Sequence, residues 1–409
     1  MTRRTGSADL PLHGGHVPAW LATRMAALGR VISEAIVHHY GPEELLRRLA
    51  HPFWFQSFGA VMGMDWHSSG ITTSVIGALQ RGLAPVRREL GIYVCGGKGL
   101  RALETPRQLA QLGDETGVDA AVLTHASRLV AKVDSAAVQD GYELYLHAFI
   151  ATAGGHWCVV QQGMNAQRRE ARRYHWLSEQ VRDFLDSPHS AIEGRARGQI
   201  LNLADTRAAA SRGASLELVR RGPDHTVRIL RQLQSARTGS LSLFPDGEAP
   251  LPHLRLPAHH NVRADDILLP RLHAALAAAA DRGPQDFQEL LLTPGVGART
   301  VESLALVAEV IHGAPARFSD PARFSMAHGG KDGHPFPVPL KVYDQTIRVL
   351  KQAVTSARLG NDDKLAAIAK LDAQARWLER VIIAGPDFEQ LLTRERESSP
   401  LFGGRKVGG

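Results

Sequence analysis

Residues 141–164, GYELYLHAFIATAGGHWCVVQQGM, decide how the middle of this chain folds. Strand-forming residues alternate in polarity in the first half, and a second apolar run follows in the other half. Between them, Ala153-Gly154-Gly155 supplies residues that accept the unusual backbone angles of a tight turn. The pattern predicts a β-hairpin whose first strand carries Glu143, Tyr145 and His147 on one face.

Segments with helical periodicity flank this hairpin. From Val17 to about Leu100, apolar residues recur every three or four positions, which predicts mainly helices. Residues 117–124 and 129–133 have a strand-like composition. After the hairpin, residues 165–185, NAQRREARRYHWLSEQVRDFL, are predicted to return to helix. The sequence therefore predicts an α+β module over residues 1–234, mainly helical and containing a small β-sheet or hairpin.

The rest of the chain is predicted to contain a linker, a helical domain and a tail. Residues 235–262 carry four prolines and no convincing periodicity, which is typical of an interdomain linker. Residues 263–395 are expected to form an all-α domain. Residues 396–409 are expected to form a flexible tail.

A glycine-containing motif lies inside the predicted helical domain. It is PGVGART, residues 294–300, and it separates the short helix DFQELLL from a second helix with apolar residues at three-residue spacing. Two helices joined in this way leave backbone N–H groups pointing outward at a helix N-terminus, where they can bind a phosphate oxygen. We therefore expect nucleic-acid contacts from Pro294, Gly295, Val296, Gly297, Arg299 and Thr300. The alternative is an ordinary turn between two helices.

This motif resembles the helix-hairpin-helix of DNA repair proteins, especially the endonuclease III-like glycosylases. In that family the hairpin binds the backbone of one DNA strand without recognising its sequence. Arg299 stands where bifunctional members carry the Schiff-base lysine, and a guanidinium cannot form the imine, so lyase chemistry is not expected. Asp320 is the nearest candidate for the family's catalytic aspartate, although it lies a few residues late. An N-cap role before Pro321 is the alternative for Asp320.

Acidic and amide side chains gather around the predicted hairpin. Metal-dependent nucleases hold Mg²⁺ or Mn²⁺ between two carboxylates and use a further polar group to position water. We therefore predict Asp134, Asp140 and Glu143 as metal ligands. Gln161 and His147, on the two strands of the hairpin, complete this predicted catalytic site. The alternative is that Asp140 belongs to a turn and that Glu143 only faces water.

Basic residues predict a second contact with nucleic acid. The helix expected over residues 165–185 carries two pairs of arginines one turn apart, next to aromatic residues. Each arginine can neutralise one phosphate, and the aromatic rings can stack on unpaired bases. The expected contacts are Arg168, Arg172, Arg173, His175 and, in a glycine-rich loop further on, Lys331. A solvated basic face is the alternative.

Three other clusters carry chemically active residues. His13 and His16 form one, and residues 65–68, DWHS, form another; contiguous side chains diverge, so these can contribute only singly to a composite site. Residues 95–99, CGGKG, follow a strand-like segment but lack P-loop spacing, so no nucleotide is expected. Haem and structural zinc are not expected either, and there are only two cysteines to ligate zinc.

Composition restricts the class of protein. The 409-residue chain contains 48 Lys and Arg against 41 Asp and Glu, and its formal net charge of +7 favours a polyanionic partner. Its low cysteine content excludes a disulfide framework and indicates a reducing compartment. No run of about 18 apolar residues exists, so no membrane span is expected. We expect a cytoplasmic protein that binds DNA more readily than RNA, and the sequence leaves its oligomeric state open.

Several strings in the chain resemble an uncharacterised family of bacteria and archaea, known as domain of unknown function 763. They are RTGSADLPLHGGHVPAWL, FWFQSFGAVMGMDWHSSGITTSVIGAL, VCGGKG, VQDGYELYLHAF, VVQQGMN and ARRYHWLS. The resemblance covers most of the chain up to and including the PGVGART motif. It implies that the N-terminal region is one integral module, and it supplies no activity.

Together these features predict a DNA repair or processing nuclease. The N-terminal module would hydrolyse phosphodiester bonds with the help of a metal ion, and the helical domain would hold the backbone. A non-catalytic DNA- or RNA-binding adaptor and a DNA glycosylase centred on Asp320 are the alternatives.

Overall fold

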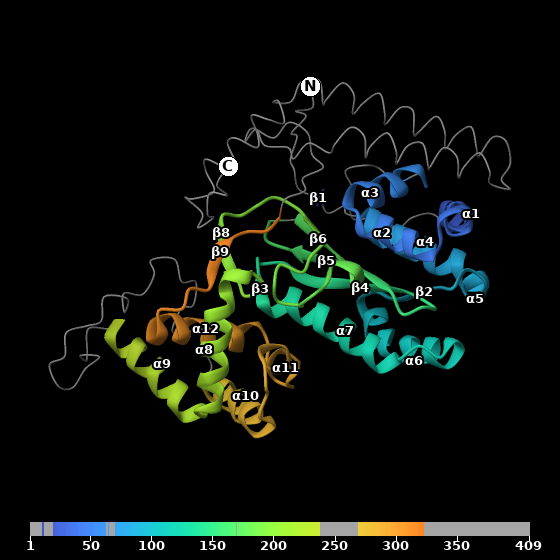
Figure 1. The fold of residues 1–409 in the computed structure, drawn as a ribbon. Coiled ribbons are helices and arrows are strands. Elements are labelled where there is room, and N and C mark those ends of the chain that lie inside the picture. Colours follow the sequence, from blue (N-terminus) through green and yellow to red (C-terminus); the bar gives the residue numbers. More distant parts are fainter. Residues whose placement is uncertain are drawn as a thin grey trace, which may run out of the picture.

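The computed structural model describes residues 10–11, 19–62, 64, 70–168, 170–237 and 269–322, and an antiparallel β-sheet lies at its centre (Figure 1). The strand order is β1-β6-β5-β4-β2, and β7 also pairs with β6. The strands are β1 (Leu10–Pro11), β2 (Ile92–Lys98), β4 (Glu143–Thr152), β5 (Trp157–Asn165), β6 (Glu170–Leu177) and β7 (Ala191–Glu193). Strands β4 and β5 form the predicted hairpin, so the α+β class is confirmed in a sheet larger than expected.

Helices from the N-terminal part of the chain cover one face of this sheet (Figure 1). Apolar residues such as Phe55, Phe58 and Ile71 share one core with Ile150 and Val160 of the sheet. The helices are α1 (Ala19–Tyr40), α2 (Pro42–Ala50), α3 (Pro52–Val61) and α4 (Gly70–Leu83), followed by the 3-10 turn η1 (Ala84–Val86) and α5 (Arg87–Leu90). The prediction of mainly helical structure from Val17 to about Leu100 is confirmed up to the end of α5. Beyond α5, strand β2 replaces the expected helix.

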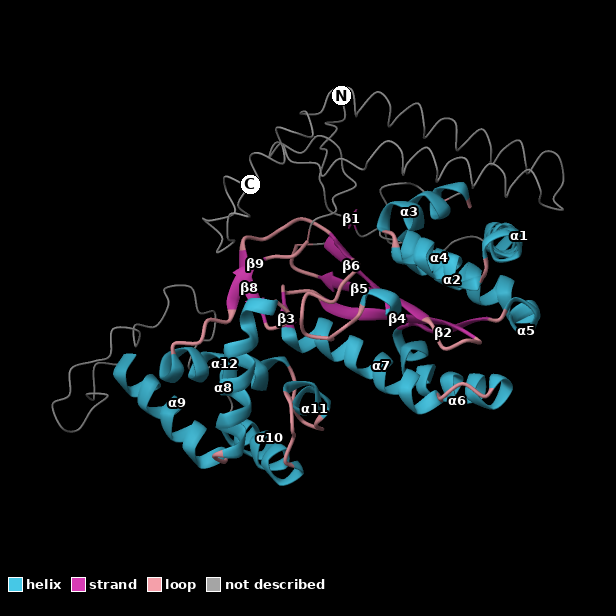
Figure 2. Cartoon of the chain, viewed as in Figure 1, coloured by secondary structure: helices cyan, strands magenta, loops and turns pink. Residues whose placement is uncertain are grey.

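A second helical layer packs against the other face (Figure 2). It begins with the 3-10 segment η2 (Gly99–Glu104), α6 (Thr105–Thr116), α7 (Ala120–Lys132) and the π-helical turn η3 (Val133–Ala137). The helices that follow pack on one another and on α7 and η3 (Figure 2). They are α8 (Ala209–Arg220), α9 (Pro223–Arg237), α10 (Leu269–Arg282), α11 (Phe287–Leu292) and α12 (Ala298–His312), and the 3-10 turns η4 (Ser178–Gln180) and η5 (Thr206–Ala208) precede them.

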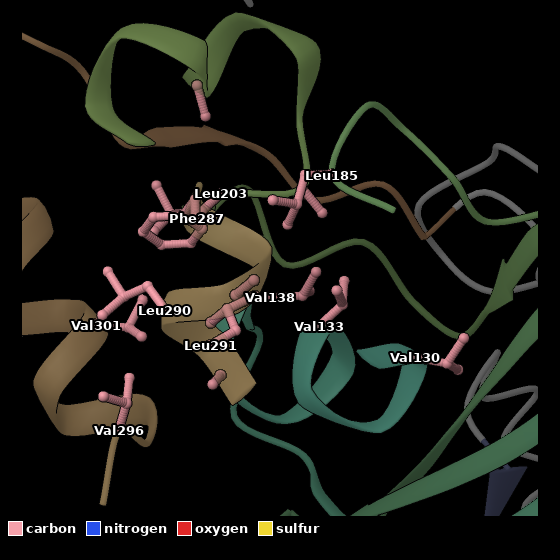
Figure 3. Close-up of a cluster of buried hydrophobic side chains, with 14 of the residues drawn as sticks. Val130, Val133, Val138, Leu185, Leu203, Phe287, Leu290, Leu291, Val296 and Val301 are labelled. Carbon is pink, nitrogen blue, oxygen red and sulfur yellow. The ribbon is translucent and has the colours of Figure 1, made fainter. Parts of the chain in front are cut away.

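The segment from α10 onward shares its core with the N-terminal part of the chain. Figure 3 shows Leu291 and Val301 of this segment in the same cluster as Val133 and Val138. A second sheet also joins the two parts, with β8 between its neighbours: β3 (Val138–Gln139), β8 (Gln199–Asn202) and β9 (Arg317–Ser319). Strand β9 lies within the region expected to be all helical, and its pairing places that region on the sheet module.

The strands predicted over residues 117–124 and 129–133 are wrong, because most of these residues belong to α7. Asp119 caps this helix by accepting hydrogen bonds from the amides of Ala121 and Val122. The buried residues of α7 recur at helical spacing and face the sheet. Apolar runs of this length are ambiguous, and the capping aspartate distinguishes the two structures.

The helix predicted over residues 165–185 is also wrong. Its centre is strand β6, which pairs with β5 along its whole length and with β1 and β7 on its other edge. Consecutive side chains of β6 therefore enter opposite faces of the sheet, and the residues from Ala171 to Leu177 are all buried. Burial between two helical layers overrides the polar, helix-like composition of this segment.

Several predicted regions lie outside the described residues. These are nearly all of the 235–262 linker, the helical domain beyond Ala322 and the 396–409 tail. Residues 235–237 of the predicted linker belong to α9. In the described part of the chain, no helix combines the length and apolar character needed to cross a membrane.

Candidate nucleic-acid interface

The PGVGART motif forms a tight turn between α11 and α12. Pro294 and Gly295 are exposed, and the backbone of Gly295 has a positive φ of 85°, which glycine adopts without strain. Val296 is buried and packs into the core, where its side chain anchors the turn (Figure 3). The turn therefore has an open backbone on the outside and an apolar anchor on the inside.

The first turn of α12 begins with amide groups that no side chain caps. The first helical hydrogen bond runs from the Val301 amide to the Gly297 carbonyl, so the amides of Ala298, Arg299 and Thr300 precede it. Gly297 is the N-cap and has no side chain to accept from them. A Cβ added at Gly297 would meet no atom within 4 Å, so the space in front of these amides is open.

Side chains from α7 and β3 hold the backbone of the turn in place. Lys132 donates from Nζ to the Val296 carbonyl at 2.6 Å, and Gln139 donates from Nε2 to the Ala298 carbonyl at 2.8 Å. Burial lowers the pKa of Lys132. Two side chains thus hold carbonyl groups on either side of Gly297, which keeps the neighbouring amides in one orientation.

Cations surround the turn. Arg299 is exposed at the start of α12, and Lys132 is half-buried beneath the turn. Arg128 is exposed on α7, one helical turn before Lys132, and therefore lies on the same side of that helix. Positive side chains and a positive helix end act in the same direction on an anion.

Asp134 belongs to a buried hydrogen-bond chain. Its carboxylate accepts from Gln161 Nε2 at 2.5 Å, from Trp176 Nε1 at 2.9 Å and from His189 Nε2 at 2.5 Å. Gln161 Oε1 in turn lies 2.7 Å from His147 Nδ1. Three residues of the predicted catalytic site, Asp134, Gln161 and His147, therefore do come together, in a chain of hydrogen bonds inside the protein.

The direction of this chain defines the tautomer of His147. Because the amide group of Gln161 donates to Asp134, its Oε1 must accept, so His147 Nδ1 carries the proton. His147 Nε2 then accepts from the Ser127 hydroxyl at 2.8 Å. Burial lowers the pKa of His147, which keeps the ring neutral. The chain connects α7 to β4 and β5 beneath the protein surface.

Asp140 is engaged by a different partner. Its Oδ2 accepts from Arg172 at 2.8 Å and from the Tyr174 hydroxyl at 2.7 Å. Arg172 also makes a two-pronged ion pair with Asp320, at 3.0 and 2.8 Å, and all three side chains are buried. Burial alone would lower the pKa of Arg172, but the charges of Asp140 and Asp320 raise it.

This ion triad excludes the predicted roles of its members. Asp320 also accepts from the amides of Arg197 and Ala322, so both of its oxygens are saturated. A carboxylate in this environment is not accessible to a DNA substrate. The triad joins β6 to the segment that follows β9, and it therefore stabilises the fold.

Glu143 lies apart from both networks because of a β-bulge. The β4–β5 register shifts between Leu144 and Leu146, so Tyr145 and Leu146 pack on the same face of the sheet. The shift places Glu143 and His147 on opposite faces, against the prediction that they share one. Glu143 is exposed. The predicted ligands Asp134, Asp140 and Glu143 therefore do not come together, and among the described residues no three His, Cys, Asp or Glu side chains form a group that could hold a metal ion.

Arg173 and His175 are buried on the face opposite Arg172. Arg173 forms an ion pair with Glu193 and donates to Gln56 Oε1 at 2.9 Å. It also donates to His175 Nε2 at 3.0 Å, while His175 Nδ1 lies 3.1 Å from the Leu49 carbonyl. Burial and the neighbouring Arg173 charge hold the pKa of His175 well below its usual range. Predicted phosphate contacts from Arg172, Arg173 and His175 are thus incompatible with their placement.

Arg168 is the member of this basic set that reaches solvent in the described structure, in the turn between β5 and β6. Lys331 and the two clusters around His13 and Asp65 lie outside the described residues. Sequence analysis missed Ser127, Lys132, His189 and Glu193, each of which lies far along the chain from its partner. Only the strand periodicity of residues 171–177 could have indicated the buried arginines.

One family model covers both the sheet and the α11–α12 turn. A family model described as "Protein of unknown function (DUF763)" matches residues 6–338. The chain belongs to the DUF763 family. The match includes both the central sheet and the α11–α12 turn, so the turn is part of the family's own region. No curated protein and no solved structure gives a significant match.

Proposed function

We propose that this DUF763 protein binds the phosphate backbone of nucleic acid, preferentially DNA, through the α11–α12 turn. The observation that carries the proposal is the uncapped start of α12, where three consecutive amides precede the first helical hydrogen bond and open space lies beside Gly297. Such an arrangement binds a phosphate oxygen by directed hydrogen bonds and by the positive end of the helix dipole.

Two further features support phosphate as the ligand. The turn has the PGVGART pattern that resembles the helix-hairpin-helix of DNA repair proteins, in which the backbone of one strand is held without sequence recognition. Arg299 and Lys132 add positive charge on either side of the turn. Backbone amides and flexible cations bind the phosphodiester group itself. Such contacts do not distinguish one base from another.

The proposal is limited to binding. Asp140 and Asp320 are neutralised inside an ion triad, and Asp134 accepts three internal hydrogen bonds. This placement does not support metal-assisted hydrolysis at Asp134 and Asp140. It does not support base removal at Asp320 either. The non-catalytic alternative of the sequence analysis is therefore the form of the function that the geometry favours.

A salt titration of binding tests the proposal. We expect the affinity of the full chain for a labelled duplex DNA to fall steadily with rising salt, because bound phosphates release counterions. Arg299→Gln should weaken binding about 3- to 10-fold and reduce the salt slope by about one. Arg81→Gln is the matched control, since Arg81 is an exposed arginine on α4, which packs on the opposite face of the sheet.

The outcome is informative in both directions. Binding that does not change with salt, or that falls equally in both variants, would remove the turn as the binding site. A duplex RNA of the same sequence, measured in parallel, tests the DNA preference without affecting the assignment of the turn.

A further inference from the structure

Strand β2 forms an open edge of the central sheet (Figure 1). The Ala153 amide donates to the Gly91 carbonyl, so this residue pair exchanges hydrogen bonds across the ladder. Because hydrogen-bonded pairs alternate along an antiparallel ladder, Ile92, Val94 and Gly96 point their amides and carbonyls away from β4. These groups are available to whatever lies beside the sheet.

Two glutamines occupy the outward groups of Gly96. Gln108 Oε1, on α6, accepts from the Gly96 amide at 2.7 Å, and Gln80 Nε2, on α4, donates to its carbonyl at 2.7 Å. Ile92 is fully buried at the other end of the strand. Val94, which is half-buried and lies between them, has its amide and carbonyl on the same outer edge.

Val94 faces a pocket of about 420 Å³. The edge of β2 forms its floor, and α4, α5 and α6 contribute its walls. Apolar surface comes from Leu83 and Leu112, and amide side chains come from Gln108 and Gln111. A pocket that combines apolar surface with a donor and an acceptor side by side is suited to a nucleobase, whose edge carries the complementary pair.

A second pocket, of about 390 Å³, adjoins the first and shares Gln80 and Arg101 with it. Its charged lining residues are Lys98 and Arg101, and its lining contains no carboxylate. Gly97 and Gly99 adopt φ of 130° and 60°, which bends the backbone around this pocket. Positive side chains at a glycine-rich turn form a site for an anion such as a phosphate.

The two acids that line the first pocket, Glu104 and Glu115, already have partners. Glu115 pairs with Arg87 at 2.5 Å, and Glu104 pairs with Arg107 at 2.6 Å. In the described part of the chain, Arg101 has no carboxylate partner. The charge of Arg101, on the boundary of the two pockets, is therefore available to a ligand.

We propose that these two pockets form one binding site for a nucleoside monophosphate. The base lies in the first pocket against the amide and carbonyl of Val94, and the phosphate lies in the second against Lys98 and Arg101. An extended peptide fits less well, because Gln80 and Gln108 block strand pairing beyond Val94. The size of the pockets matches a ligand of this class.

This proposal runs against an expectation from the sequence. Residues 95–99 lack P-loop spacing, and on that basis no nucleotide was expected. A P-loop holds phosphate at the N-terminus of a helix, whereas here the phosphate site follows from two basic side chains beside a bent edge strand. The proposal is independent of the α11–α12 turn, which lies in a different part of the fold.

Calorimetric titration of the full chain with deoxyadenosine 5′-monophosphate tests the site. We expect saturable binding, at least tenfold weaker binding of deoxyadenosine, and at least tenfold weaker binding of the nucleotide to Arg101→Gln. Arg107→Gln is the control, because Arg107 is an exposed, ion-paired arginine in the first turn of α6, six positions after Arg101, and lines neither pocket. Absence of saturable binding, or equal binding by both variants, would overturn the proposal.

A second variant separates base recognition from phosphate binding. Val94→Pro removes the outward amide, which the β2–β4 ladder does not use, and proline is tolerated on edge strands in that orientation. We expect it to weaken binding of the nucleotide about tenfold while leaving the weak binding of inorganic phosphate unchanged. Unchanged nucleotide binding in a folded Val94→Pro protein, judged by an unaltered melting temperature, would contradict the placement of the base.

Discussion

Strand β6 and the α11–α12 turn both carry basic residues, and the fold uses them in opposite ways. Arg172 and Arg173 of β6 are fully buried, and each is neutralised by acids from distant parts of the chain. The turn contributes only Arg299, yet it exposes that side chain and a row of backbone amides. The number of arginines in a segment is therefore a poor measure of the positive charge available to a ligand.

The difference follows from secondary structure. A strand inserted between two helical layers must bury every side chain, so its arginines survive only with buried partners. A turn at the start of a helix must leave its first amides without backbone partners, so it binds an anion with hardly any side-chain charge. The first arrangement stabilises the fold, and the second is the arrangement that we propose binds phosphate.

Removal of Arg172 should produce the largest effect. Arg172→Ala leaves Asp140 and Asp320 buried without a counter-charge, and we expect a loss of about 3–5 kcal/mol in the free energy of unfolding, measured by urea denaturation. Arg168→Ala is the control, because Arg168 is exposed in the preceding turn and should change stability by less than about 0.5 kcal/mol. If the two variants were equally stable and Arg172→Ala bound DNA more weakly, Arg172 would instead be a phosphate contact at the protein surface, as the sequence predicted.

Acid should destabilise the protein through its buried histidines. The pKa of His175 and of His147 is lowered in the folded state, so the unfolded chain takes up protons first as pH falls through about 6.5. Unfolding free energy should therefore decrease between about pH 7.5 and about pH 5.5. Burial raises the pKa of Glu193, which gives the opposite slope at lower pH.

A His175→Gln variant isolates the histidine contribution. Glutamine keeps a donor and an acceptor near Leu49 and Arg173 but does not titrate. Its urea midpoint should depend less on pH than that of the unmodified protein over the same range. An equal pH dependence in the two proteins would show that His175 is not a buried neutral histidine.

A smaller effect is expected at the support of the turn. Lys132→Met removes the hydrogen bond to the Val296 carbonyl and should cost about 1–2 kcal/mol in unfolding free energy. The same variant should weaken DNA binding several-fold, because the turn loses both a charge and an anchor. Arg128→Gln, one helical turn away, should leave stability unchanged; a loss of stability as large as that of Lys132→Met would mean that the hydrogen bond to the turn has no special role.

Local features of the sequence predicted the structure well. The hairpin of β4 and β5 and the α11–α12 turn each depend on glycine-containing turns and on contiguous apolar patterns, so a short window contains their cause. The cap of α7 by Asp119 was equally local, and greater weight on it would have replaced the predicted strands with a helix.

Features with distant causes were not predictable. Arg172 is paired with Asp320, 148 positions further along the chain, and no local pattern indicates that contact. A single bulge between Leu144 and Leu146 separates Glu143 from His147, and the strand alternation gave no sign of it. The candidate phosphate site was therefore accessible from the sequence, whereas the predicted metal site depended on a register that the sequence does not determine.

Substitution of Gly297 tests the phosphate site most directly. Its extended backbone, with φ of −135°, suits an N-cap aspartate or asparagine, and either side chain should preserve the fold by capping α12. Asp and Asn are nearly the same shape, so Gly297→Asp and Gly297→Asn differ only in charge. Fluorescence anisotropy with duplex DNA should show binding to Gly297→Asp at least tenfold weaker than to Gly297→Asn, at equal melting temperatures. Equal affinities of the two variants would contradict phosphate binding at this turn.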